Sequence, residues 1–259
     1  MNFNQNSHRR KNILTGEWVL VSPHRTKRPW QGKQEDSGEI KTISYDPNCY
    51  LCPGNKRANG EINPNYINTF SFINDFSAIM DSEGDNLKDG LLEAETESGI
   101  CKVLCYSPNH SMTIPQMKVE EIVLIIKLWQ KEYRELGTLN SINHIQIFEN
   151  KGEIMGCSNP HPHGQIWAQK SIPQEVKKKQ FNLKKYYAEN NESLLSAYLK
   201  KELKVKERII CQNESFVALV PFWATWPFEA MIISKTHYKS ILELSENEII
   251  DFASILKTL

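Results

Sequence analysis

Hydrophobic positions recur along the chain with two different periods. Residues 99–106 form a nearly continuous apolar run and residues 142–149 alternate, so both are predicted to be strands. Residues 119–133 instead place apolar side chains at helical spacing, at positions 122, 125, 126 and 129. The same criteria predict further strands at 17–22, 66–73, 165–168, 217–221 and 230–234, and lysine-rich helices across 174–206. The chain therefore mixes strands and helices.

The strand–turn–helix pattern occurs twice, at an offset of 127 residues. Ser107 and His110 are matched by Ser234 and His237, and the likeness continues into the helices that follow. Chance likeness between two strand–helix units is the alternative explanation, because buried strands and helices share a composition. We interpret the pattern as an internal repeat.

The two halves of this repeat differ in length. After its helix the first half continues into the strand at 142–149 and a histidine motif, whereas the counterpart would begin at position 269 of a 259-residue sequence. We expect a first half at 1–170, which carries the functional groups, and a helical excursion with an incomplete second half at 171–259.

Charge and composition exclude several classes of function. Lysine plus arginine and aspartate plus glutamate number 31 each, so no global field attracts nucleic acid or an anionic membrane. No apolar run approaches the ~18 residues of a membrane span, and residues 1–18 lack a signal-peptide pattern. We expect a soluble, cytoplasmic protein. Six unevenly spaced cysteines do not form a disulfide framework, and Cys157 and Cys211 are predicted to be buried thiols.

The chemically richest stretch is 148–167, which contains His161-Pro-His163. We expect the two imidazoles to diverge, one as a structural ligand and the other facing a pocket. A neutral imidazole is a competent nucleophile toward phosphorus near pH 7, and a covalent phosphoramidate would split one transfer into two steps. Gly156 and Gly164 are expected to let the backbone approach a phosphate. The alternative is a polar surface turn.

Cys49 and Cys52 have the spacing of half a zinc site. His110 and one histidine of the 161/163 pair would complete a closed Cys2His2 set. Two buried free thiols are the alternative. Cys101 and Cys105 compete as ligands, but a strand places both on one face, which favours packing in the core.

Two polar segments are candidates for binding a nucleotide. Arg25 and Arg28 lie in a proline-bounded loop, and guanidinium groups grip phosphate in a bidentate manner. A solvated basic loop is the alternative. Asn74 and Asp75 follow a predicted strand, where they either contact a ribose or uracil edge or simply end the strand in a turn.

The order and identity of these motifs resemble one known family. The run from Phe148 to Gln165 resembles the signature of the galactose-1-phosphate uridylyltransferases, which belong to the histidine-triad superfamily. Segments 22–32, 49–55, 74–76, 107–110 and 220–229 match the same family in the same order. The resemblance covers essentially the whole chain. It implies an α+β fold of two histidine-triad-like halves, each an antiparallel sheet with flanking helices, the second half incomplete here.

The resemblance also implies roles for individual residues. His163 is similar to the nucleophile that becomes uridylylated, and Gln165 to the glutamine that binds the transferred phosphate where related hydrolases have a third histidine. The implied zinc ligands are Cys49, Cys52, His110 and His161. The implied substrate contacts are Arg25, Arg28, Ala58, Asn74, Asp75, Asn150, Gly156, Cys157, Ser158 and Gln165.

The implied reaction is a ping-pong exchange of galactose metabolism in a homodimer. UDP-glucose would uridylylate the enzyme and release glucose 1-phosphate, and galactose 1-phosphate would then leave as UDP-galactose. A related nucleotidyltransferase of the superfamily, or an inactive or weakly active nucleotide-sugar binder, is the alternative. A second, iron-type metal site of the family is not expected, because Lys179 occupies the position of its glutamate and Glu175 lies one helical turn away.

Overall fold

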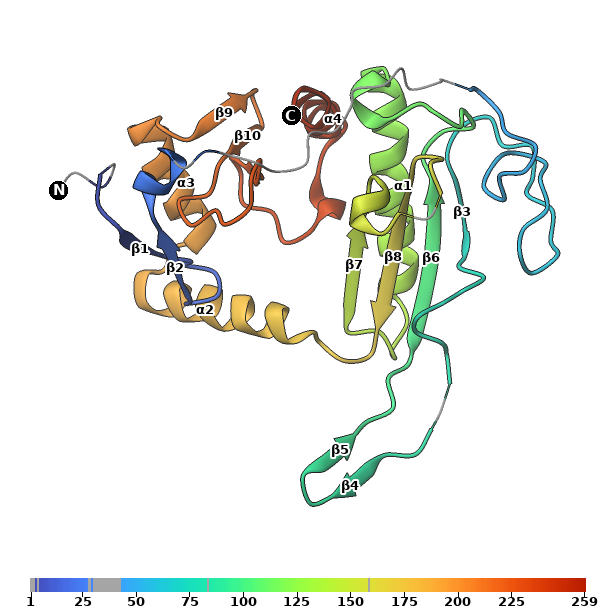
Figure 1. Ribbon diagram of the computed structural model, residues 1–259, viewed down its shortest axis with the longest axis horizontal. Coiled ribbons are helices and arrows are strands. Elements are labelled where there is room, and N and C mark those ends of the chain that lie inside the picture. The colour runs from blue at the N-terminus through green and yellow to red at the C-terminus, as the bar shows by residue number, and fades with distance from the viewer. Residues whose placement is uncertain (1–2, 4, 28, 30–42, 83, 158) are drawn as a thin grey trace. The chain divides into compact units, whose positions relative to one another are not determined.

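The computed structural model describes residues 3, 5–27, 29, 43–82, 84–157 and 159–259 (Figure 1). The chain divides into two compact units. The first unit comprises Met1–Ile40, Gln174–Lys239 and Thr258–Leu259, and the second comprises Lys41–Pro173 and Ser240–Lys257. Both units mix strands and helices, which confirms the α+β class.

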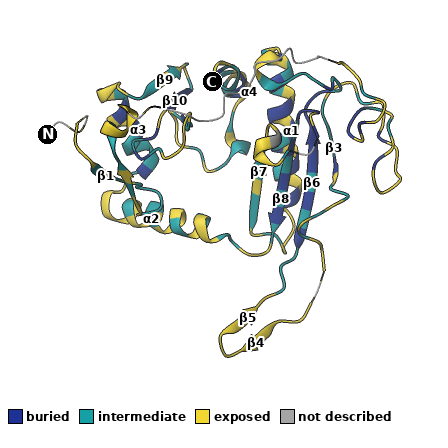
Figure 2. Cartoon of the chain, in the orientation of Figure 1, coloured by how far each residue is buried: buried dark blue, intermediate teal, exposed yellow. Residues whose placement is uncertain are grey.

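The second unit is built on a four-stranded antiparallel sheet in the order β3-β6-β8-β7. Its elements are β3 (Phe70–Ile73), β4 (Leu87–Asp89), β5 (Leu92–Ala94), β6 (Gly99–Cys105), η2 (Ile114–Gln116), α1 (Val119–Gly137), β7 (His144–Phe148), η3 (Glu153–Met155), β8 (His163–Gln169), η4 (Ile241–Glu243) and α4 (Glu246–Thr258). β4 and β5 form a separate exposed hairpin, which is yellow in Figure 2.

The two faces of the sheet differ in how deeply their side chains are buried. Along β8, Ile166 and Ala168 are fully buried in the cluster that includes α1, whereas His163, Gln165 and Trp167 are only partly buried on the other face. This is the period-2 alternation of a strand with one face on the core. The sheet therefore presents the histidine motif on the face that α1 does not cover.

Helix α1 packs an apolar stripe into the cluster that covers one face of this sheet. Ile122, Ile125 and Ile126 are fully buried at i, i+3 and i+4, and each such side chain contributes about 1.5–3 kcal/mol of burial free energy. At the first turn, the Glu121 carboxylate accepts a hydrogen bond from the Lys118 backbone N–H at 2.7 Å. This contact satisfies one backbone donor just ahead of the helix.

The structure gives a reason for glycine at position 164 that the sequence analysis did not foresee. A Cβ atom at Gly164 would lie 2.1 Å from the Tyr106 hydroxyl oxygen. Tyr106 is buried in the cluster around α1, so Gly164 points to the core and away from the face of His163. The contact with Tyr106 by itself requires glycine here, and the prediction that Gly164 also lets the backbone approach a phosphate stays a prediction.

The first unit carries two smaller sheets and two helices. Its elements are β1 (His8–Lys11), β2 (Trp18–Val21), η1 (Pro23–Lys27), α2 (Gln174–Asn190), α3 (Leu194–Val205), β9 (Ile209–Gln212), β10 (Phe216–Leu219) and β11 (Met231–Ser234). β1 pairs with β2, and β11, β10 and β9 form an antiparallel sheet in that order. Leu199 of α3 packs with Val217 and Leu219 of β10 in a small core.

The internal repeat recurs in the structure at the offset read from the sequence. η2 and η4 begin at Ile114 and Ile241, and α1 and α4 begin at Val119 and Glu246, both 127 residues apart. Glu248, which corresponds to Glu121, likewise accepts a hydrogen bond from the backbone N–H three residues earlier, at 2.8 Å. Similar local chemistry therefore starts both helices. The division at residue 170 refers to halves of the sequence and stays a prediction, because the compact units combine separated ranges.

Most predicted elements are present, and the differences lie in exposed or polar segments. β1, the β4–β5 hairpin and β9 were not expected from the sequence, and β8 begins at His163 rather than at residue 165. Cys157 and Cys211 are half-buried, so the prediction that both are buried thiols is wrong. Within the described residues, none of the helices has both the length and the apolar character needed to span a bilayer.

A buried ion pair links α1 to the sheet and provides a test of the packing. Glu132 is fully buried and accepts hydrogen bonds from Ser71 Oγ at 2.5 Å and from Lys102 Nζ. Glu132→Ala should lower the free energy of unfolding by about 3 kcal/mol or more, because it leaves a largely buried ammonium without a partner. Urea denaturation measures this change.

Glu135→Ala is the matched control, because Glu135 pairs with Lys131 on the exposed side of the same helix at 4.0 Å. It should cost less than about 1 kcal/mol. Equal losses from the two variants would show that the pair of Glu132 does not hold the helix to the sheet.

Candidate metal centre and nucleotide pocket

Two cysteines and two histidines converge in the second unit. All four residues are buried, and their ligand atoms lie within 4.8 Å of one another: Cys49, Cys52, His110 and His161. Cys52 Sγ lies 3.5 Å from Nδ1 of both histidines, and Cys49 Sγ lies 3.8 Å from Nδ1 of His161. Tetrahedral bonds of about 2.0–2.3 Å place neighbouring ligand atoms roughly 3.5–3.8 Å apart. These residues fit a metal ion.

His161 is held in the orientation and protonation state of a ligand. Its Nε2 lies 2.9 Å from the backbone carbonyl oxygen of Ser107, which only accepts hydrogen bonds, so Nε2 carries the proton and Nδ1 is directed to the sulfurs. Burial lowers the pKa of His161 to about 4. The ring is therefore neutral near pH 7, the form that binds a metal.

The thiols need a cation to act as ligands. Burial raises the pKa of Cys52 to about 11, and the nearby Cys49 adds to the shift. A metal ion in the cluster supplies the opposite charge that stabilises a thiolate. Asn159, which the sequence analysis missed, supports the cluster. Its amide nitrogen lies 3.5 Å from Cys49 Sγ, and its Oδ1 accepts a hydrogen bond from the His161 backbone N–H at 2.9 Å.

A small pocket lies directly beside this cluster. Its volume is about 150 Å³, and it is lined by Tyr50, Leu51, Phe72, Asn74, Asp75, Phe76, Val103, His163 and Gln165. Tyr50 and Leu51 stand between the two cluster cysteines, and His163 follows His161 by two residues. The residues of the metal cluster therefore also position one wall and the imidazole of the pocket.

His163 has one ring nitrogen engaged. Its Nδ1 lies 2.7 Å from the backbone carbonyl oxygen of His161, so Nδ1 carries the proton and Nε2 keeps its lone pair. If both histidines lay in one strand, their side chains would point to the same face, because residues i and i+2 of a strand share a face. His161 and His163 diverge as expected, and the reason is that β8 begins only at His163, whereas His161 lies in the proline-flanked turn before it.

The structure brings together four of the predicted pocket residues: Asn74, Asp75, His163 and Gln165. Asn74 also ends β3, since its Oδ1 accepts a hydrogen bond from the Phe76 backbone N–H at 2.9 Å. The strand-ending turn is therefore confirmed, and the contact with a ribose or uracil edge stays a prediction. Among the residues that the structure describes, the Gln165 amide has no hydrogen-bond partner, which leaves its donors available to a ligand.

Four other predicted contacts of the second unit, Ala58, Asn150, Gly156 and Cys157, are not among the described residues that line this pocket. Ala58, Asn150 and Gly156 are exposed, and Cys157 is half-buried, with its Sγ 3.0 Å from the Asn159 carbonyl oxygen. Arg25 is exposed in η1 of the first unit. Arg28 and Ser158 lie outside the described residues. Their predicted roles stay predictions.

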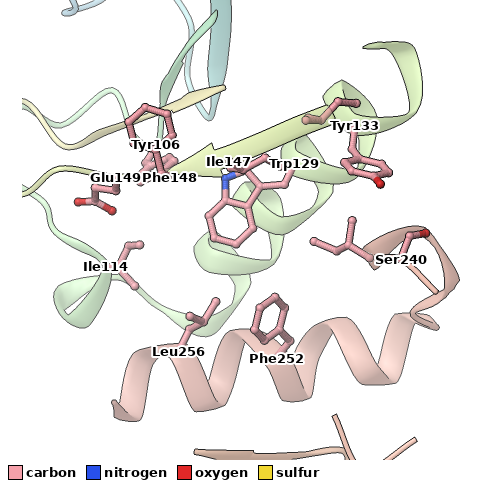
Figure 3. A pocket seen from close by; sticks show the side chains of 12 residues that line it. Tyr106, Ile114, Trp129, Tyr133, Ile147, Phe148, Glu149, Ser240, Phe252 and Leu256 are labelled. Carbon is pink, nitrogen blue, oxygen red and sulfur yellow. The ribbon is translucent and has the colours of Figure 1, made fainter. Parts of the chain in front are cut away.

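A larger cavity of about 500 Å³ in the second unit has different chemistry (Figure 3). Trp129 of α1 and Phe252 and Leu256 of α4 point into it. Glu149 is its one carboxylate, and burial raises the pKa of that group. The described residues of its lining include neither histidine nor cysteine, so this cavity offers no imidazole for phosphoryl chemistry, in contrast to the smaller pocket.

The fold and the site define an α+β protein in which a buried Cys2His2 cluster that could hold a metal ion lies beside a pocket lined by a histidine. Residues 1–173 match the family model for galactose-1-phosphate uridyl transferase, N-terminal domain, and residues 177–259 match the model for its C-terminal domain. The chain belongs to the galactose-1-phosphate uridyl transferase family, whose members are transferase enzymes.

Individual relatives agree with this assignment. Galactose-1-phosphate uridylyltransferases from Saccharomyces cerevisiae and Haemophilus influenzae are each 48% identical, over 99% and 98% of this chain and 74% and 73% of their own lengths. Among solved structures, a uridylyltransferase matches with a TM-score of 0.71 at 26% identity, covering 97% of this chain and 73% of its own. An Arabidopsis thaliana ADP-glucose phosphorylase with bound ADP-glucose matches with a TM-score of 0.73 at 27% identity, over 98% and 76%.

The cluster predicts about one tightly bound transition-metal ion per chain. Cys52→Ser should lose most of this metal and lower the melting temperature, because a structural ion contributes folding free energy. Elemental analysis of purified protein and a thermal scan measure both effects. Cys211→Ser is the matched control, since this half-buried thiol lies outside the cluster and should keep the metal. Equal metal content in the two variants would contradict the assignment.

Proposed function

We propose that this chain exchanges a uridylyl group between UDP-glucose and galactose 1-phosphate through a covalent uridylyl-His163 intermediate. One observation carries the proposal: in the pocket, His163 Nδ1 lies 2.7 Å from a backbone carbonyl oxygen, so the neutral ring has its lone pair on Nε2. Membership in the family supports the substrates. A homodimer, which the resemblance implies, and a cytoplasmic location, which the sequence pattern leads us to expect, belong to the same proposal.

In the first step, the lone pair of His163 Nε2 attacks the α-phosphorus of UDP-glucose. The bond from that phosphorus to the bridging oxygen breaks, and glucose 1-phosphate leaves with the bond electrons. The ring gains positive charge as the nitrogen–phosphorus bond forms. The His161 carbonyl stabilises that charge, because it already accepts the Nδ1 proton.

In the second step, a phosphate oxygen of galactose 1-phosphate attacks the same phosphorus. The nitrogen–phosphorus bond breaks, UDP-galactose leaves and neutral His163 is restored. Gln165 is the candidate donor to the transferring phosphoryl oxygens in both steps, because it lies in the same pocket. A neutral amide binds those oxygens without supplying the acid–base help that would favour attack by water.

We assign zinc to the cluster, with Cys49, Cys52, His110 and His161 as its ligands. Two thiolates and two imidazoles are the usual set for structural zinc, and four protein ligands leave no open coordination position. The ion would therefore contribute stability, while this chain's own side chains perform the transfer.

Adenylyl transfer is the second candidate, favoured by the structural likeness to the ADP-glucose phosphorylase. Identities of 48% to two galactose-1-phosphate uridylyltransferases, over 99% and 98% of this chain, favour uridine. Parallel assays with UDP-glucose and ADP-glucose separate the two candidates, and a faster release of glucose 1-phosphate from ADP-glucose would reverse this choice.

Incubation with UDP-glucose labelled in the α-phosphate should leave an acid-labile, base-stable adduct on His163, as expected for a phosphoramidate. His163→Gly should abolish this adduct, because no other pocket side chain presents an imidazole. Peptide mapping under alkaline conditions locates the label. His237→Gln, a change at an exposed histidine, should keep it. Label that persists in His163→Gly would place the nucleophile elsewhere.

Gln165→Ala should slow formation of the adduct about 10²-fold, the usual effect of removing one donor to a developing oxyanion. The free energy of unfolding and the metal content should stay near those of the unmodified chain. Rapid-quench measurement of the adduct follows the rate. Gln146→Ala is the control, since Gln146 is exposed on the neighbouring strand β7. A Gln165→Ala rate within about threefold of the control would remove Gln165 from the mechanism.

A further inference from the structure

Arg57 is a buried cation beside the pocket that the functional assignment does not use. Its backbone lies in a tight turn, where the Arg57 N–H donates to the Glu61 carbonyl at 2.7 Å and the Gly60 N–H donates to the Arg57 carbonyl at 3.1 Å. The side chain is only 7% exposed. An arginine is buried to this degree only when its charge is compensated.

Three groups surround the guanidinium. Asp75 Oδ1 lies 3.4 Å from one terminal nitrogen, Glu61 forms an ion pair with the other, and the Phe72 ring lies beneath with its centroid 4.3 Å from the guanidinium carbon. Two of the three, Asp75 and Phe72, line the pocket. Glu61 points the other way, with its side chain 67% exposed.

We propose that Arg57 is a positioning residue of the nucleotide pocket, which acts on the substrate by fixing the carboxylate of Asp75 and the ring of Phe72. This inference rests on the proposed function, since it assumes that the pocket binds a nucleotide. Arg57 itself is absent from the pocket lining, so its effect passes through the two residues that it holds.

The role follows from the electrostatics of Asp75. Its side chain is 7% exposed, Oδ1 has no hydrogen-bond partner within the described residues, and Oδ2 accepts only a long 3.4 Å bond from the Asn59 backbone N–H. A carboxylate with so few donors is expensive to bury unless a cation lies beside it. Arg57 supplies that cation and sets the direction in which Asp75 faces the pocket.

The guanidinium also fixes the aromatic wall. A planar cation stacked on Phe72 keeps the ring from rotating into the pocket, in addition to the electrostatic attraction. Lysine can replace the positive charge, but it has neither the planar group that stacks on the ring nor the paired N–H donors of a guanidinium. Arg57→Lys should therefore behave as an intermediate between arginine and an uncharged residue.

The test compares UMP binding and transfer kinetics across Arg57→Met, Arg57→Lys, Asp75→Asn and the double variant Arg57→Met/Asp75→Asn. UMP binding is measured by calorimetry, which does not depend on turnover. Arg57→Met should weaken UMP binding and raise KM for UDP-glucose by about 10–100-fold, because the pocket wall is misplaced. kcat should change by less than about threefold, since the lost contact is the same in ground and transition states.

Because part of the effect of Arg57 passes through Asp75, the same change should cost at least about threefold less when Asp75 is already asparagine, and the loss that remains is the effect on the Phe72 ring. Glu61→Gln is the matched control, as it removes the exposed partner of the same arginine and should alter UMP binding by less than about threefold. If Arg57→Met fails to fold, two other variants replace it. Arg57→Lys is compared with the unmodified chain, and the double variant is compared with Asp75→Asn. The double variant is expected to fold because it leaves no unpaired buried charge in this pair.

Unchanged UMP binding in Arg57→Met, or an equal loss with and without Asp75, would overturn the positioning role while the uridylyl adduct still forms. A role in stability alone would lower the melting temperature and leave UMP affinity as in Glu61→Gln, which also overturns it. An unmodified chain that neither binds UMP nor forms the adduct would overturn the proposed function, and this inference with it.

Discussion

Four buried ligand atoms from distant parts of the chain are the constraint on which the site depends. Cys49 and Cys52, His110 and His161 meet within 4.8 Å although more than a hundred residues separate the first from the last. A structural zinc ion contributes about 10–16 kcal/mol of apparent binding free energy, comparable with the ~5–15 kcal/mol stability of a whole domain. That free energy is ample to hold three loops together, because closure entropy grows only slowly with loop length.

The position of His163, the proposed nucleophile, is set by this cluster and by the sheet. Two residues before His163, the His161 ring faces the sulfurs, and one residue after it, Gly164 lies against the Tyr106 ring. The backbone of His163 is also paired with Cys105 in the register of β6 and β8. Restraint on both sides leaves the imidazole little freedom, and a transfer reaction is sensitive to displacements of about 1 Å.

Elements of this fold are predictable from the sequence where a segment has a single clear hydrophobic period or a recognisable set of chemical groups. Helix α1 and strand β6 were predictable because burial of one face determines where their apolar residues fall. The β4–β5 hairpin is exposed throughout and has no such pattern. The role of Arg57 was hidden for another reason: an arginine in a polar turn resembles any solvated charge, and only the fold brings it to Asp75.

In the proposed mechanism, His161 would connect a metal ion in the cluster to the chemistry of His163 without any contact between the ion and the substrate. Its ring faces the cysteines, whereas its backbone carbonyl accepts the Nδ1 proton of His163. With four protein ligands, an ion in the cluster would have no position for a phosphate oxygen and would supply stability rather than Lewis-acid help. Its influence would pass through His161, whose backbone carbonyl favours the His163 tautomer with the proton on Nδ1. The metal cluster and the nucleophile therefore form one structural unit, joined by a single residue with two roles.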